Sequence, residues 1–543
     1  MSSKNMAAKT TKEEAETKNP QKQRQILALS LVLTTILGFL FFDANVSTGG
    51  DDALYIQRAY NFIHKGAWPE FQGPLYPIIL SIFTYIFGIN LFALKVISIL
   101  ATLGFLYFFY QTFRDVLPKF LLVGTLFIFA INASLLYYAS QTYNEAFFLF
   151  LQMTFIYLFK IQILDDWRDY QWQDYKKFII IALFLILLFL TKTVAIAALP
   201  AVLFFLVFYK KYKAAILTLG AFILFFLAYQ ATKQFVFTSE GLQMSTQGSS
   251  LLLKNPYDPS QGKEDVSGFV TRFFTNSNQY ISQQFYKFLG LRADEYVLPN
   301  YTFVTFFTFV LFFAGLYFFY RHSRTQFFLG MYLLITLGAT FIVLQALWNQ
   351  ERLIIPFAPL AVVFLLHTIY GYLSKYKLGN AKTICMILVG ILLLAGAIKT
   401  LGKLPNKADQ LMAYVNGDRL ESFTPDWQHY IEMCQYAANN LPEGSLTAVR
   451  KPGIAFIYSG GHNFYGIYRV ESNDPDTLYQ KLKNAGVTHV VVASLRLVPD
   501  RNTGRVISTI RKYLGLVRQK YPEKLQAIHK IGEEEPAYLF ELK

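Results

Sequence analysis

Long apolar segments constrain the fold of this chain more than any other feature of its sequence. They recur between residues 26 and 401, and most are about 17 to 23 residues long. A helix of that length crosses roughly 30 Å of hydrocarbon. Because lipid offers the backbone no hydrogen-bond partner, a chain crosses it only as helices or as a closed barrel. With 54% hydrophobic and only 16% charged residues, the sequence predicts a polytopic α-helical membrane protein.

About eleven transmembrane helices are predicted from these segments. The apolar segment 75–87 is not among them, since it is short and bounded by proline and glycine; we interpret it as an interfacial or re-entrant helix. The predicted spans are 26–42, 91–113, 120–138, 145–163, 178–191, 194–209, 214–232, 301–320, 326–344, 353–372 and 383–401.

Basic residues in the short connections indicate the orientation of these helices. If the N-terminus is cytoplasmic, the basic clusters within 114–119, 168–177, 210–213, 321–324 and 375–382 all lie inside, as the positive-inside rule requires. This orientation also explains much of the net charge of +15, so no nucleic-acid partner is expected. The sequence therefore predicts a multi-pass protein of the cytoplasmic membrane, with an extracytoplasmic C-terminal region.

Three regions follow from this topology. Residues 1–24 are rich in Lys, Thr and Glu and are predicted to form a disordered cytosolic tail. Residues 25–402 form the transmembrane domain, with external loops at 43–90 and 233–300. A loop as long as the second is usually a lid or a binding loop, or else disordered. Residues 403–543 have a soluble composition.

Helix and strand patterns alternate in that last region, which predicts an extracytoplasmic α/β domain. Helices are expected at 427–440, 475–485 and 505–521, and strands at 446–450, 455–458, 489–493 and 537–541.

The first external loop carries the strongest functional signal. It reads GGDDALYIQRAYNFIHKGAWPEFQGPLYP over residues 49–77 and opens with Asp51 and Asp52. Adjacent side chains on a helix diverge by about 100°, so both carboxylates cannot face one substrate atom. One carboxylate is expected to take part in the reaction, and the other is expected to support its position. The alternative is a solvated loop that only joins two helices.

Other charged residues stand at the same outer boundary. Glu145 begins a span, where its alternative role is a favourable interaction with the helix dipole. Lys192 lies between two spans, where its alternative role is that of a lysine reaching toward the membrane interface. Arg352 precedes another span, where it could instead pair with Glu351 or with a lipid headgroup. Together they place carboxylates and cations on one side, which suits transfer from a lipid-linked phosphate: a base for the acceptor and cations for the leaving group.

No motif requires a metal or another cofactor. Cys385 and Cys434 show neither a disulfide framework nor metal-ligand spacing. Phosphate-loop, dinucleotide and HExxH motifs were not found.

The order of several motifs resembles a known family. After the Asp51 loop come GPLYPIILSIFTYIFG at 73–88 and LFALKVISILATLGFLYFFYQTF at 91–113, and ERLIIPFAPL begins a later span at 351. This order resembles the glycosyltransferase family 39-like branch of the GT-C membrane glycosyltransferases, which includes protein O-mannosyltransferases and aminoarabinose transferases of lipid A. The resemblance covers roughly residues 25–372.

The resemblance implies an inverting transfer of a sugar from a polyprenyl-phosphate donor to an extracytoplasmic acceptor, which is a glycolipid, a glycan or a protein. Asp51 matches the catalytic carboxylate of the family, and Asp52 stands where Glu is common. Asp51 is then the general base for the acceptor hydroxyl.

The expected substrate-binding residues are Tyr55, Glu145, Lys192 and Arg352, the last two stabilising the departing phosphate. Some family members carry a lysine just before their proline pair. Here Gln72 and a glycine precede the proline, so other cations must contact the phosphate.

Two other functions are compatible with the sequence. A transporter or flippase would need many spans as well, but its charges are expected near the membrane midplane rather than at one boundary. A membrane polymerase or ligase acting on glycans would use a similar lipid phosphate without depending on Asp51. In every case membrane lipids are partners.

Overall fold

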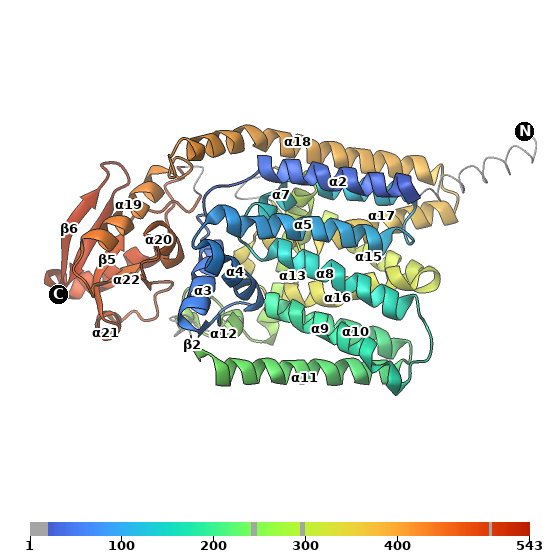
Figure 1. Cartoon of the computed structure of the whole chain (residues 1–543), viewed down its shortest axis with the longest axis horizontal. Coiled ribbons are helices and arrows are strands. Elements are labelled where there is room, and N and C mark those ends of the chain that lie inside the picture. The colour runs from blue at the N-terminus through green and yellow to red at the C-terminus, as the bar shows by residue number, and fades with distance from the viewer. Residues whose placement is uncertain (1–19, 240–246, 294–298, 499–501) are drawn as a thin grey trace, which may run out of the picture.

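The computed structural model describes residues 20–239, 247–293, 299–498 and 502–543. Most of the predicted tail, residues 1–19, lies outside the described residues. The chain forms a bundle of roughly parallel helices with a smaller α/β domain at one end, and the first described helix begins at the other end (Figure 1).

Helices occupy all of the predicted spans. They are α2 (Pro20–Leu40), α5 (Leu91–Phe113), α6 (Lys119–Ala130) with α7 (Ala133–Ala139), α8 (Glu145–Phe159) continued by the π-helix η1 (Lys160–Leu164), α9 (Tyr175–Thr191), η3 (Thr193–Ala197) with α10 (Ala198–Phe208), α11 (Tyr212–Val236), α15 (Thr302–His322), α16 (Arg324–Val343), α17 (Ala358–Lys375) and α18 (Ala381–Val415).

Fewer helices than predicted are long and apolar enough to cross a membrane. Among the described residues seven meet that requirement, or eight if α6 and α7, bent by 54° at their junction, count as one span. The helices α9, α10 and α17 do not meet it. The remaining predicted spans are also helical, but their helices are shorter or less apolar than this criterion of length and composition requires.

The outer surface of the bundle is apolar. In the most apolar parts of α11, α15 and α18 only 22%, 22% and 17% of the residues are buried. Large side chains such as Leu224 and Leu394 are exposed. Exposed apolar surface of this extent needs a non-aqueous environment. The protein is thus a multi-pass membrane protein.

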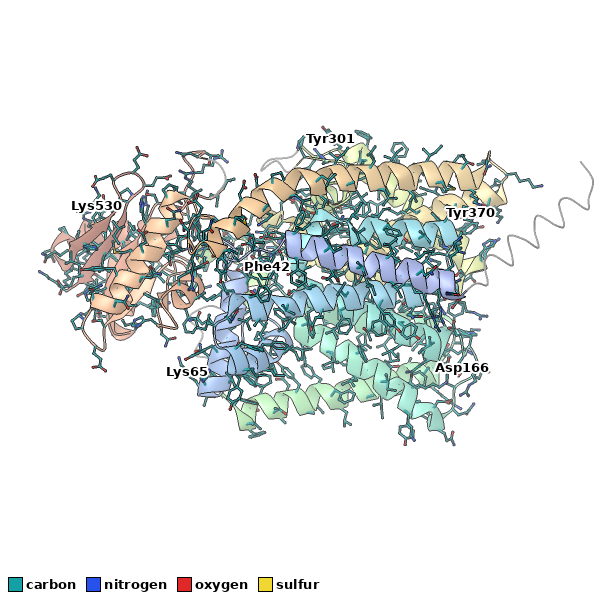
Figure 2. The ribbon with its side chains drawn as sticks, turned by 45° about the horizontal axis from the view of Figure 1, so that its top comes forward. Phe42, Lys65, Asp166, Tyr301, Tyr370 and Lys530 are labelled. Carbon is teal, nitrogen blue, oxygen red and sulfur yellow. The ribbon has the colours of Figure 1, made fainter. Side chains whose placement is uncertain are left out.

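Two short helices lie at the end of the bundle that carries the α/β domain. Helix α3 (Asp51–Lys65) has both aspartates in its first turn, where they oppose the positive end of the helix dipole, and it ends at Gly66 in the left-handed conformation. Helix α4 (Leu75–Phe87) packs against α3 and confirms the short helix predicted there. Figure 2 shows Lys65 at this end and Asp166 at the opposite one.

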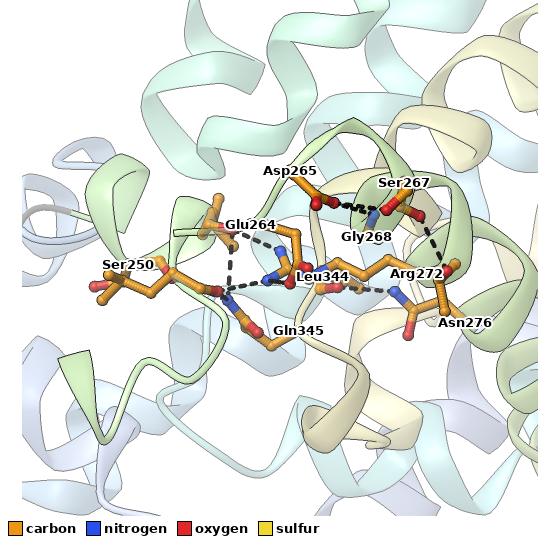
Figure 3. Close-up of polar contacts among 12 residues, drawn as sticks. Ser250, Glu264, Asp265, Ser267, Gly268, Arg272, Asn276, Leu344 and Gln345 are labelled. Atoms are coloured by element: carbon orange, nitrogen blue, oxygen red, sulfur yellow. Dashed lines mark hydrogen bonds and ion pairs between the residues drawn. The ribbon is translucent and has the colours of Figure 1, made fainter. Parts of the chain in front are cut away.

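The described part of the second external loop is folded. It contains α12 (Gln247–Leu252), α13 (Val266–Gln279), the π-helix η5 (Tyr280–Phe285) and α14 (Tyr286–Phe288). Figure 3 shows how polar side chains fix it to the end of α16. Arg272 donates to the carbonyl oxygens of residues 251 and 253, and Gln345 donates to those of residues 250 and 253. Residues 240–246 and 294–298 of this loop lie outside the described residues.

The C-terminal region has the predicted α/β character. Its sheet has the strand order β4-β3-β5-β7-β6, with β3 parallel to β4 and β5, and β7 antiparallel to β5 and β6. Its elements are α19 (Pro425–Asn440), β3 (Leu446–Val449), α20 (Pro452–Tyr458), β4 (Tyr465–Gly466), α21 (Pro475–Asn484), β5 (Val487–Val492), α22 (Thr509–Lys520), β6 (Leu525–Ile531) and β7 (Ala537–Leu542).

Several details of this domain differ from the sequence prediction, among them the two-residue strand β4, which was not predicted. Residues 455–458, predicted as a strand, belong to α20; a short apolar run cannot be assigned by periodicity, and Pro452 favours the start of a helix. Strand β6 was not predicted, because it is largely exposed and lacks a buried apolar face.

Candidate functional site

Two glycines place the start of α3 against other segments of the chain. Gly50 has a φ of 82°, a conformation that glycine adopts without steric cost. At Gly49 a Cβ atom would lie 2.8 Å from the hydroxyl of Tyr143. The two glycines of the Gly-Gly-Asp-Asp sequence therefore allow both a tight turn and a close approach, which together fix the position of Asp51.

Asp51 forms an ion pair with Arg352. Its Oδ2 atom lies 2.5 Å from Nη2 of Arg352, which comes from the short helix η7 (Glu351–Leu353). The guanidinium also lies over the ring of Tyr143, 5.2 Å from its centroid. Burial acts to raise the pKa of Asp51, but Arg352, with Lys451 and Arg58, lowers this pKa below its ordinary value. The carboxylate is therefore charged at neutral pH.

Asp52 faces a different environment. Its two carboxylate oxygens accept hydrogen bonds from the backbone N–H and the hydroxyl of Ser47, at 2.7 and 2.9 Å. The Ser47 hydroxyl lies 2.7 Å from that of Tyr143. Burial raises the pKa of Asp52 in spite of these hydrogen bonds. As expected for adjacent helical residues, the two aspartates do not face the same group.

Glu145 and Lys192 form a second ion pair. Oε1 of Glu145, at the start of α8, lies 2.8 Å from Nζ of Lys192, which lies between α9 and η3. The Glu145 side chain is only 2% exposed, and its Oε2 atom makes no hydrogen bond with the described residues. The structure thus brings together two residues that the sequence nominated separately.

Tyr55 lies within electrostatic range of both pairs. Its ring packs edge-on against Tyr76, with centroids 5.4 Å apart. Burial, followed by the charges of Glu145 and Asp51, raises the pKa of Tyr55 well above its ordinary value. The phenol is therefore neutral and available as a hydrogen-bond donor.

Sequence reasoning missed several residues that surround Asp51. Tyr143 and Ser47 were not nominated, and Lys451 was assigned no role. Yet Nζ of Lys451 donates to the carbonyl oxygen of Gly49 at 2.5 Å, across 402 positions of the chain. A single sequence carries no signal for a contact at that separation.

A second polar cluster holds the loop before α3 in place. Lys95 is fully buried, and its Nζ atom donates to the carbonyl oxygens of Asp43 and Asn45 at 2.6 and 2.5 Å. Lys407 of α18 pairs with the Asp43 carboxylate at 2.9 Å. These contacts tie the loop to α5 and α18, and they fix the position of α3.

The candidate site is separate from a cavity of about 380 Å³ at the opposite end of the bundle. That cavity is lined by Lys160, Asp165, His322 and His367, among others. Within the described ranges, no group of three or more His, Cys, Asp or Glu side chains is placed to hold a metal ion.

Known proteins match the chain in structure but not in sequence. No protein family model matches it, and no curated protein matches it. The archaeal oligosaccharyltransferase AglB from Archaeoglobus fulgidus, in complex with an inhibitory peptide and a dolichol-phosphate, has a TM-score of 0.52 and 13% identity; the match covers 86% of this chain and 69% of that one. An Archaeoglobus fulgidus oligosaccharyltransferase in complex with Zn and sulfate has a TM-score of 0.54 and 14% identity, over 86% and 67% of the two chains.

A bacterial structure matches over nearly the full length of both chains. ArnT from Cupriavidus metallidurans, bound to undecaprenyl phosphate, has a TM-score of 0.52 and 12% identity, over 95% of this chain and 97% of that one. At such low identity these matches establish the fold. The chain has the fold of the GT-C membrane glycosyltransferases, as the resemblance of its sequence motifs predicts.

Proposed function

We propose that this protein transfers a sugar from a polyprenyl-phosphate donor to an acceptor outside the cytoplasmic membrane. The observation that carries the proposal is the charged carboxylate of Asp51, held by Arg352 at the start of α3 within a GT-C fold. The lipid phosphates bound to AglB and ArnT support a donor of that class. The acceptor is a glycolipid, a glycan or a protein.

The proposed reaction is an inverting displacement with Asp51 as the general base. Asp51 accepts the proton of the acceptor hydroxyl while the hydroxyl oxygen attacks the anomeric carbon of the sugar. A new carbon–oxygen bond forms on one face. The bond from the anomeric carbon to the phosphate oxygen breaks on the other, and its electron pair leaves with the lipid phosphate.

Arg352 is the proposed main cation for the departing phosphate. One edge of its guanidinium binds Asp51, while its buried Nε atom makes no hydrogen bond with the described residues. A guanidinium presents donors on more than one edge, so it can bind a carboxylate and a phosphate together. Lys192, held by Glu145, is the second proposed cation, and Tyr55 a donor to substrate.

Asp52 is the proposed supporting residue. Its hydrogen bonds with Ser47 close the turn that precedes α3. It therefore helps to position Asp51 without meeting the same substrate atom.

We also propose that the α/β domain and Asp51 lie outside the membrane and the N-terminus inside. The described start of α2 and the α/β domain lie at opposite ends of the bundle, which supports this orientation (Figure 1). Tyr212 at the start of α11 is exposed, and both native cysteines are buried. In intact cells Tyr212→Cys should resist an impermeant thiol reagent and Lys483→Cys in α21 should react; the reverse result would contradict the orientation.

The activity itself is tested with purified protein in vesicles and a labelled polyprenyl-phosphate sugar. A transferase consumes the donor and releases one lipid phosphate for each sugar that reaches the acceptor. Movement of intact donor across the membrane by folded protein, without consumption of donor, would instead indicate a transporter.

A further inference from the structure

The α/β domain makes close contact with α3 through α20. Gly453 approaches the α3 backbone so closely that a Cβ there would lie 3.0 Å from the amide nitrogen of Leu54. The rings of Tyr60 and Phe456 pack edge to face at 5.3 Å. This contact fixes the start of α20 beside the start of α3.

The same contact brings two cations of the domain to the Asp51 site. Nζ of Lys451 donates to the carbonyl oxygen of Gly49, and it lies within electrostatic range of Asp51 and Arg352. Arg450 lies within electrostatic range of Asp51, and its Nε atom is buried without a hydrogen bond to the described residues.

The cations around Asp51 outnumber the carboxylates. Arg58, Arg352 and Lys451 all act on the charge of Asp51, and Arg450 lies within electrostatic range of it, whereas the carboxylates that act on Lys451 are Asp51 and Asp52. Buried positive charge without a counter-ion is unfavourable. Burial, followed by the charge of Arg450, accordingly lowers the pKa of Lys451 to about 7. An anionic ligand would offset this excess of positive charge.

We propose that Arg450 and Lys451 bind a phosphate group of a substrate beside Arg352, so that the α/β domain is part of the reaction centre. The location rests on the proposed function of Asp51. The phosphate comes either from the lipid donor or from an acceptor that carries one. Since both sources present the same group, the test includes a probe for each.

Binding is measured with the full chain in lipid nanodiscs, using farnesyl phosphate as the donor probe and glycerol phosphate as the acceptor probe. Lys451→Met should weaken binding of one probe about tenfold, or about 1.4 kcal/mol. Lys451→Arg keeps the charge and should bind within about twofold of wild type, and Arg450→Gln should weaken the same probe as Lys451→Met. Weaker binding of farnesyl phosphate identifies the lipid donor as the source of the phosphate. Weaker binding of glycerol phosphate identifies the acceptor as its source.

Two controls separate this site from general effects. Lys483→Met removes an exposed lysine of α21 in the same domain and should leave binding unchanged. Farnesol shares the lipid tail but lacks the phosphate, so its binding should not respond to Lys451→Met. If that variant does not fold, Arg450→Gln and Lys451→Arg still test the site.

The proposal is overturned if wild type shows no phosphate-dependent binding, or if Lys451→Met and Arg450→Gln bind both probes as tightly as Lys483→Met does. Binding requires no turnover. Phosphate binding that depends on Lys451, in a protein that transfers no sugar, would contradict the proposed function and leave this site intact.

Discussion

The two ends of the helical bundle pair their charges in different ways. At the end that carries the α/β domain, Arg352 pairs with Asp51 across 301 positions, and Lys451 reaches Gly49 across 402. At the opposite end the separations are shorter: Asp166 pairs with Arg168 and Lys177, two and eleven positions away, and Lys211 pairs with Asp169 across 42 positions. Local pairs form wherever charges are close in sequence, whereas the distant pairs exist only because the whole fold brings them together.

This difference supports the proposal that the end with Asp51 carries the chemistry. Asp166 and its partners are each 29 to 45% exposed, and exposed ion pairs contribute little to stability. Glu145 and Asp52 are almost fully buried, and burial of a charged group is costly. Strongly perturbed, partly buried charges are typical of functional sites. A large cavity alone, such as the one at the opposite end, is weaker evidence.

A large expected effect that separates the two ends comes from Arg352→Gln. Loss of one preorganised donor to a developing charge typically lowers kcat by about 10² to 10³. The measurement is sugar transfer with kcat and KM determined separately, with Arg352→Lys as the conservative variant. His367→Leu, in the cavity at the opposite end, is the matched control and should stay within about twofold of wild type; equal losses in both variants would contradict the distinction between the ends.

An effect on stability is expected for the buried pair of Glu145 and Lys192. Lys192→Met leaves the carboxylate buried without a counter-charge, which should cost about 3 to 5 kcal/mol of stability. Glu145→Gln combined with Lys192→Met removes both charges and should recover most of that loss. Thermal unfolding in detergent measures both variants.

At the opposite end, Asp166→Asn should change the stability by about 1 kcal/mol or less. A loss of stability in Asp166→Asn as large as that in Lys192→Met would show that burial does not distinguish the two ends.

Another modest effect is a pH dependence. The pKa of Lys451 lies below its ordinary value, at about 7, so its positive charge is present below that pH and is lost as the pH rises through it. Asp51, with a lowered pKa, stays charged, and the guanidinium groups of Arg352 and Arg450 stay protonated. Affinity for a phosphate probe should therefore fall up to about tenfold between pH 6 and 8.5.

Lys451→Arg should flatten that profile. Ionisation of the probe itself is common to both proteins, so it cancels in the comparison. Identical profiles for wild type and Lys451→Arg would mean that Lys451 does not contact the phosphate.

The sequence alone predicts the helices of the bundle and the α/β character of the C-terminal domain, because apolar segments and alternating patterns are local signals. It also nominates Asp51 and Arg352 separately. Their pairing, and the approach of Tyr143 and Lys451, depend on contacts between distant segments, which one sequence does not reveal. Residues 455–458 show the limit at shorter range, since a brief apolar run suits a strand or a buried helix equally.

The most direct test of the proposed mechanism compares Asp51→Asn with Asp52→Asn in the transfer of a labelled sugar. An asparagine at position 51 keeps the shape of the side chain but cannot accept the proton, so transfer should fall by about 10² to 10⁴ while phosphate binding persists. Asp52→Asn retains an acceptor for Ser47 and should keep transfer within about tenfold of wild type. Transfer within tenfold of wild type in Asp51→Asn would contradict the assignment of Asp51 as the base.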